Sequence, residues 1–130
     1  MIVDSSAMVA MLRNEPEAHA FFAVLTDQAA AAISAASYLE TAIVVDAKRD
    51  PVLSASLDSL LGRLQLTIAP VTPEQARIAR QAYRDFGRGS GHPARLNFGD
   101  CFAYALAMER GEALLYKGDD FAHAGVARAV

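Results

Sequence analysis

Short apolar runs alternate along the chain with longer helical segments, and this alternation limits the possible folds more than any other feature. Apolar spacing and capping residues separate the two kinds of segment. Strands that alternate with helices predict an α/β fold, with a mostly parallel sheet covered by helices on both faces. The predicted strands are residues 1–3, 30–33, 66–69 and 113–116, and the predicted helices are residues 5–12, 15–26, 34–48, 50–63, 97–110 and a segment that begins at residue 72.

Two of these segments keep alternative interpretations. Residues 30–33 read either as a short buried strand or as the approach to the helix that Ser34 caps, and residues 126–130 could add an edge strand. No repeat, linker or low-complexity stretch divides the chain. At 130 residues, a single domain over residues 1–130 would bury about two thirds of its unfolded surface.

Composition excludes several classes of protein. A net charge of −3 argues against a protein that coats nucleic acid or membrane by charge alone, so a polyanion must be met by a local patch. Cys101 is the single cysteine, and no Cys/His zinc pattern is present, which fits a reducing compartment. The start of the chain lacks the features of a signal peptide, and charges interrupt every long apolar stretch. We therefore expect a cytoplasmic protein without a membrane partner.

Five acidic residues are candidates for a functional site. They either follow strands of the predicted parallel sheet or lie in apolar segments, where burying a charge costs free energy. Asp4 follows the first predicted strand, and Asp119 and Asp120 follow the last. Ligand sites of parallel sheets lie beyond the carboxyl ends of the strands. Glu40 and Asp100 lie within apolar helices, and helical spacing predicts that Glu40 shares a core-facing side with its neighbours Ala36, Ile43 and Val44.

If these carboxylates converge, a cation or a proton must offset the repulsion between them. Two unit negative charges about 4 Å apart repel each other by roughly 4 kcal/mol at an effective dielectric constant of about 20. No lysine stands beside Asp4, Glu40 or Asp100 in the sequence, and an all-oxygen set suits Mg²⁺ or Mn²⁺ better than zinc or copper. Such ions activate water against phosphodiesters, so the predicted reaction is phosphodiester hydrolysis.

Four motifs spread over the chain match a known family pattern. They are Ile2-Val3-Asp4-Ser5-Ser6, Tyr38-Leu39-Glu40, Asn97-Phe98-Gly99-Asp100 at the start of an apolar helix, and Lys117-Gly118-Asp119-Asp120-Phe121. Together they resemble the PIN-domain ribonucleases of the VapC toxin type. The resemblance implies a three-layer α/β/α domain around a central, mostly parallel sheet of four or five strands. It also implies a Mg²⁺-dependent endoribonuclease that forms a homodimer and is inhibited by a VapB-like antitoxin.

The resemblance also assigns roles to individual acids. Asp4, Glu40 and Asp100 match the principal acids of the family, which bind metal directly or through water. Many relatives have Asp-x-Asp-Phe where this chain has Gly118-Asp119-Asp120-Phe121, and the alignment leaves both Asp119 and Asp120 open as the fourth acid.

Two polar residues beside these acids have two interpretations each. Ser6 matches a small hydroxyl residue common near the first acid and could bond a metal-bound water, but Ser5 or Ser6 could equally cap the first helix. Asn97 could cap the helix of Asp100 or bond the carboxylates as an outer partner. Capping is favoured for both.

Basic residues form a second pattern. Arg77, Arg80, Arg84 and Arg88 follow one another at steps of three or four residues, and Arg95 lies beyond a glycine-rich loop. Such a stripe could bind RNA phosphates, with Arg84, Arg88 and Arg95 nearest the loop. A solvated helix face explains the same spacing.

Two other classes of function remain open. A catalytically silent PIN-like scaffold would bind RNA or protein without cleaving it. A receiver-like phosphoacceptor domain also has acids after its first strand and a lysine near its last, as Asp4 and Lys117 do. Such a domain needs an early pair of adjacent acids, and Ser5 and Ser6 stand in their place.

Overall fold

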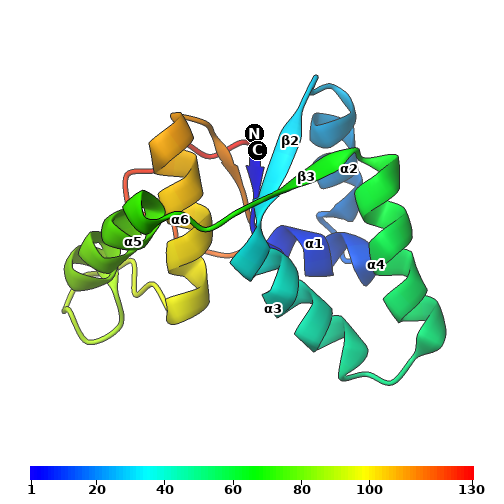
Figure 1. Cartoon of the computed structure of the whole chain (residues 1–130), viewed down its shortest axis with the longest axis horizontal. Helices are drawn as coiled ribbons and strands as arrows, with labels where there is room; N and C mark the ends of the chain where they lie inside the picture. The colour runs from blue at the N-terminus through cyan, green and yellow to red at the C-terminus, as the bar shows by residue number, and fades with distance from the viewer.

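A computed structural model describes all residues from 1 to 130, and its centre is a four-stranded parallel sheet (Figure 1). The order of the strands across the sheet is β3-β2-β1-β4, and every neighbouring pair is parallel. The α/β prediction with a parallel sheet is therefore confirmed. The strands are β1 (Ile2–Val3), β2 (Ala31–Ser34), β3 (Leu66–Ala69) and β4 (Leu114–Leu115).

Six helices connect and cover these strands. In Figure 1, α5 and α6 lie on one side of the sheet, and α1, α2 and α4 lie on the other. No helix combines the length and the apolar character that crossing a bilayer requires. The helices are α1 (Ser5–Leu12), α2 (Ala18–Thr26), α3 (Ala35–Asp46), α4 (Pro51–Arg63), α5 (Pro73–Phe86) and α6 (Phe98–Arg110).

Each strand supplies both cores of the molecule, because successive side chains of a strand point to opposite faces of the sheet. Ile2 and Leu114 pack in the core shared with α5 and α6, whereas Val3 and Leu115 pack in the core shared with α1, α2 and α4. All four side chains are fully buried. The predicted three-layer arrangement is confirmed, and the carboxyl ends of β1 and β4 lie side by side.

Several element boundaries differ from the prediction. Residues 31–34 form a strand, which settles the first open alternative, and α3 ends at Asp46 rather than residue 48. Helix α2 begins at Ala18 rather than residue 15, because a turn with Asn14 in the left-handed region (φ 50°) separates it from α1. The predicted edge strand at 126–130 is reduced to one bridge, between Leu114 and Arg128.

The cap of α1 also differs from the prediction. Asp4 is the N-cap residue, and its Oδ2 atom accepts a hydrogen bond of 2.9 Å from the backbone N–H of Ser6. Ser5 and Ser6 are the first residues of the helix itself, so the interpretation of either as its cap is wrong. The cap predicted for α6 is confirmed, because Asn97 Oδ1 accepts from the backbone N–H of Asp100 at 2.9 Å.

Candidate active site

Asp4 lies at the carboxyl end of β1 and is almost completely buried, with 2% of its surface exposed. Its Oδ2 atom accepts hydrogen bonds from the backbone N–H and from the hydroxyl of Ser6, at 2.9 and 2.6 Å. Its Oδ1 atom is buried and has no hydrogen-bond partner. A buried carboxylate oxygen without a partner is costly, so this atom is ready to bind a donor or a cation.

Ser6 connects Asp4 to the segment that follows β4. The Ser6 hydroxyl donates to Asp4 and accepts a hydrogen bond of 3.0 Å from the backbone N–H of Lys117. One side chain thereby fixes the Asp4 carboxylate against the loop that carries Asp119 and Asp120. Ser6 therefore bonds the Asp4 carboxylate and orients it.

Asp100 occupies the first turn of α6 and is also buried, with 8% of its surface exposed. Its Oδ2 atom accepts from the backbone N–H of Asn97 at 2.9 Å, and the two residues form a reciprocal capping box. Asn97 thus has both of the predicted roles, since it caps the helix and holds the Asp100 carboxylate.

The electrostatics of Asp100 show which acids lie near it. Its pKa is raised to about 7, mainly by burial and also by the negative charges of Asp4 and Asp120, while the hydrogen bond from Asn97 acts in the opposite direction. Asp119 is not among the groups that raise this pKa, although both Asp119 and Asp120 are exposed. The structure therefore brings Asp120, rather than Asp119, to the acids at the ends of β1 and α6.

Glu40 approaches the same cluster from α3. Its Oε1 atom accepts a hydrogen bond of 2.5 Å from the Ser5 hydroxyl, and its charge contributes to the raised pKa of Asp4. The Glu40 carboxylate also lies against Gly99, where any side chain would overlap with it. Gly99 thus allows Glu40 to reach the residue next to Asp100.

The helical neighbours of Glu40 correct one prediction. Ile43 and Val44 were expected on a core-facing side, but they are 61% and 40% exposed. Together with Glu40 they line an open, largely apolar groove of about 320 Å³ between α3 and α6. Helical spacing identified the shared side correctly, but that side of α3 faces solvent.

Burial dominates the electrostatics of Asp4. It is the main reason that the pKa of Asp4 rises from 3.8 to about 6, and the charge of Glu40 adds to this effect. The hydrogen bonds from Ser6 lower the pKa but do not compensate for the burial. Two neighbouring acids with raised pKa values are typical of a functional site.

The donor set fits a hard divalent cation. It consists only of carboxylate and hydroxyl oxygens, and the free Oδ1 atom of Asp4 is an unused ligand. No three His, Cys, Asp or Glu side chains form a ready-made metal cage. Mg²⁺ does not need one, because it commonly binds through one or two carboxylates and keeps several waters.

Sequence reasoning did not predict the contacts of three residues in this region. Ser5 bonds Glu40, Gly99 leaves room for it, and Lys117 lines a groove of about 450 Å³ with Ser5, Ser6 and Glu40. The small residue before Asp100 was the one available signal. The other two depend on contacts between distant segments.

The predicted basic residues are all exposed. Arg84 and Arg88 are exposed at the end of α5 and just after it, and Arg95 is exposed in the following loop. None of the three makes an ion pair, whereas Arg77 pairs with Glu74 at 3.4 Å. Their charges are therefore available to an external anion.

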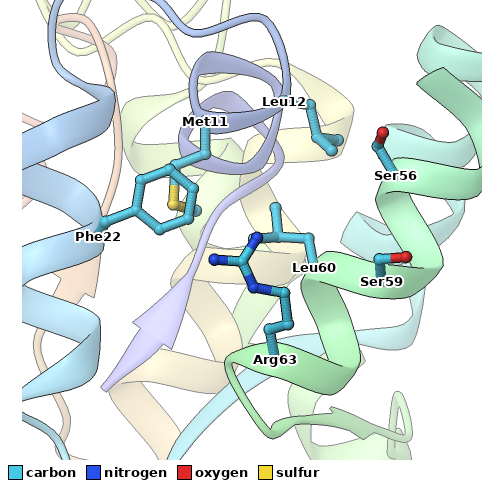
Figure 2. Close-up of a pocket in the computed structure, with 7 residues that line it drawn as sticks. All are labelled: Met11, Leu12, Phe22, Ser56, Ser59, Leu60 and Arg63. Atoms are coloured by element: carbon cyan, nitrogen blue, oxygen red, sulfur yellow. The ribbon is translucent and has the colours of Figure 1, made fainter. Parts of the chain in front are cut away.

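Cys101 is buried, and a separate groove lies between α1, α2 and α4. Burial raises the pKa of the Cys101 thiol to about 11, so the thiol stays protonated and is not a nucleophile. A groove of about 220 Å³ between α1, α2 and α4 contains none of the acids (Figure 2). It is lined by Met11, Leu12, Phe22, Ser56, Ser59, Leu60 and Arg63.

Comparison with known proteins identifies the family of this chain. The PIN domain model matches residues 1–127. Ribonuclease VapC28 of Mycobacterium tuberculosis is 57% identical over 130 residues, which is 100% of this chain and 98% of that protein. Ribonuclease VapC42 of the same species is 44% identical over 126 residues, covering 97% and 96% of the two chains. The chain therefore belongs to the PIN-domain family and, within it, to the VapC ribonucleases.

Solved structures agree with this assignment at the level of the fold. The crystal structure of VapC20 from Mycobacterium tuberculosis, described as a Sarcin-Ricin loop cleaving toxin, gives a TM-score of 0.73 at 16% identity. It covers 97% of this chain and 95% of its own. A toxin-antitoxin complex from Klebsiella pneumoniae gives 0.70 at 16% identity, with coverages of 93% and 89%. The receiver-like alternative has no support from these matches.

The raised pKa of Asp4 predicts how stability depends on pH without metal. Below pH 3.8 the folded and unfolded forms are both protonated, and between 3.8 and about 6 the folded form retains the extra proton, so stability falls as pH rises. As the pH rises from 5 to 8, deprotonation of the buried Asp4 should lower the free energy of unfolding by about 1 kcal/mol. Melting curves of the protein in EDTA should therefore show a smaller decrease for Asp4→Asn than for wild type.

The exposed Asp58 on α4 provides the matched control, and Asp58→Asn should keep the wild-type decrease. An Asp4→Asn protein that loses as much stability as wild type over this pH range would contradict the electrostatic account of the site.

Proposed function

We propose that the chain is a Mg²⁺-dependent endoribonuclease, with Mn²⁺ able to replace Mg²⁺, and the toxin of a VapBC-type toxin-antitoxin pair. Its family is that of the VapC ribonucleases, and the metal dependence is our inference from the site. The observation that carries this inference is the buried, unpartnered Oδ1 atom of Asp4 within a group of like-charged acids. Residues 1–127 match one family model, which supports a single domain.

The geometry suggests a role for each acid. Asp4 and Asp100 are the buried pair and would hold the ion, with Ser6 and Asn97 fixing their carboxylates. When bound, the ion would lower the pKa of water and offset charge on the leaving oxygen of the phosphodiester. Glu40 and Asp120 flank this pair, where they can orient water and accept a proton.

The placement of Asp120 yields a direct test of the proposed site. Asp120→Asn should lower the rate of Mg²⁺-dependent RNA cleavage by about 100-fold or more, because it removes a charge that acts on Asp100. The adjacent, exposed Asp119 is the matched control, and Asp119→Asn should retain nearly the wild-type rate. The assay is cleavage of total RNA with Mg²⁺ and with EDTA.

Three results of that assay would contradict the proposal. Cleavage that persists in EDTA would remove the metal from the account. Equal rates for the Asp119→Asn and Asp120→Asn proteins would remove Asp120 from the site. A wild-type protein that binds RNA without cleaving it would favour the catalytically silent scaffold.

We also infer that Arg84, Arg88 and Arg95 contact RNA phosphates. Their exposure and their lack of ion-pair partners support this inference. Reversing the charges with Arg84→Glu and Arg88→Glu should weaken RNA binding and reduce its salt dependence, which titration of labelled RNA at several salt concentrations measures. Reversal of the paired Arg77 is the control. Unchanged affinity at every salt concentration would exclude the stripe.

An exposed apolar surface supports a homodimer. It consists of Leu39, Ile43, Val44, Phe98 and Phe102, and we name it the α3–α6 patch. Leu39, Ile43 and Phe98 are 57%, 61% and 77% exposed. Exposed apolar residues that adjoin one another mark interaction surfaces more often than isolated ones do. We infer that a second copy of the chain covers this patch.

Light scattering of the purified protein tests the dimer. Ile43→Asp should convert dimers to monomers, because it places a charge in the apolar contact. Val52→Asp is the matched control, since Val52 is 75% exposed on α4 and lies outside the patch. A wild-type monomer, or an Ile43→Asp protein that remains dimeric, would contradict the assignment.

The same measurement tests the antitoxin. A structural neighbour is titled a toxin-antitoxin complex, and this supports a VapB-like partner for the present chain. Co-expression with the product of the adjacent reading frame should give a larger particle that cleaves RNA only after the partner is removed. If the product of the adjacent reading frame does not co-purify with this chain, the pairing is contradicted.

A further inference from the structure

Lys117 is the only basic residue that lines the groove beside Glu40. Its side chain is 36% exposed, and Ser5, Ser6, Glu15 and Glu40 line the same groove. An ammonium in this position is expected to pair with the cluster of acids. It pairs instead with two glutamates of another segment: Glu15, and Glu17 at 3.3 Å.

The turn between α1 and α2 places these two glutamates. Asn14 adopts the left-handed region, and the backbone N–H of Glu15 donates to the carbonyl of Ala10 at 2.9 Å. The carbonyl of Glu15 in turn accepts from the backbone N–H of Ala18 at 2.9 Å, where α2 begins. The backbone of this turn is therefore fixed from both sides, and both of its carboxylates contact Lys117.

The backbone of Lys117 is fixed as well. Its N–H donates to the hydroxyl of Ser6, which itself bonds Asp4. Lysine has a flexible side chain of four carbons and rotatable donors, so only its ammonium is free to change partners. Without Glu15 and Glu17, the carboxylate on the same groove is that of Glu40.

We propose that Glu15 and Glu17 are positioning residues that hold the Lys117 ammonium away from Glu40, so that the acids stay free to bind a divalent cation. This inference rests on the proposed function. An ammonium next to Glu40 would neutralise part of the negative charge that attracts the cation. The pairing of Lys117 therefore maintains the acidity of the site.

Calorimetric titration with Mn²⁺ alone, without RNA, tests this inference. The double variant Glu15→Gln/Glu17→Gln should bind Mn²⁺ about fivefold more weakly than wild type, the size of one partly exposed ion pair. Adding Lys117→Met to the double variant should restore the affinity, because no ammonium remains to compete. The triple variant also lacks the same ion pairs, so it is the matched control for changes in folding.

A second control removes two charges elsewhere. Asp27 and Asp58 are exposed and form no ion pair, so Asp27→Asn/Asp58→Asn should keep wild-type affinity for Mn²⁺. Equal weakening in this control would show a general effect of charge and overturn the inference. Unchanged Mn²⁺ affinity in the double variant would also overturn the inference. So would a triple variant that still binds Mn²⁺ weakly, because this would show that the glutamates bind Mn²⁺ themselves.

The Asp4→Asn protein separates this inference from the proposed function. If the wild-type protein binds Mn²⁺ and the Asp4→Asn protein does not, the metal site is upheld. In that case, unchanged Mn²⁺ affinity in the double variant overturns only the proposed role of Lys117. Wild type that binds no Mn²⁺ overturns both.

Discussion

The burial of one carboxylate at the end of β1 is the constraint on which the site depends. Asp4 caps α1 through Oδ2, which also accepts the Ser6 hydroxyl, while Oδ1 has no partner. A fold normally avoids such an atom, because desolvation without a hydrogen bond costs free energy. The rest of the site makes this arrangement tolerable: Ser6 fixes the carboxylate to the loop after β4, and the start of α1 presents its positive dipole end to it.

The neighbouring acids come from other elements, and local interactions stabilise their charges as well. Asp100 is buried in the first turn of α6, where the capping box with Asn97 and the helix dipole favour its negative charge. Glu40 comes from α3 and is held by Ser5. These local interactions offset only part of the cost, since the pKa values of Asp4 and Asp100 remain raised to about 6 and about 7. The remaining cost, which comes mainly from burial and partly from repulsion between the acids, is the free energy that a divalent cation would recover on binding.

The layered fold and the candidate acids were predictable from sequence, because both rest on local patterns. Apolar runs that alternate with capped helices define the parallel sheet, and acids that follow strands define its ligand edge. Contacts between distant segments were not predictable in this way. Helical spacing grouped Glu40 with Ile43 but did not show that this side of α3 faces solvent. Nor could it show that Lys117 pairs with Glu15, or that Asp120 rather than Asp119 faces Asp100.

A crystal structure of the protein grown with Mn²⁺ is the most direct test of the central claim, because anomalous scattering locates the ion without reference to activity. We expect an anomalous peak within coordinating distance of Asp4 Oδ1, with Asp100 as a second ligand. An ion bound elsewhere, with Asp4 Oδ1 still without a partner, would contradict the account.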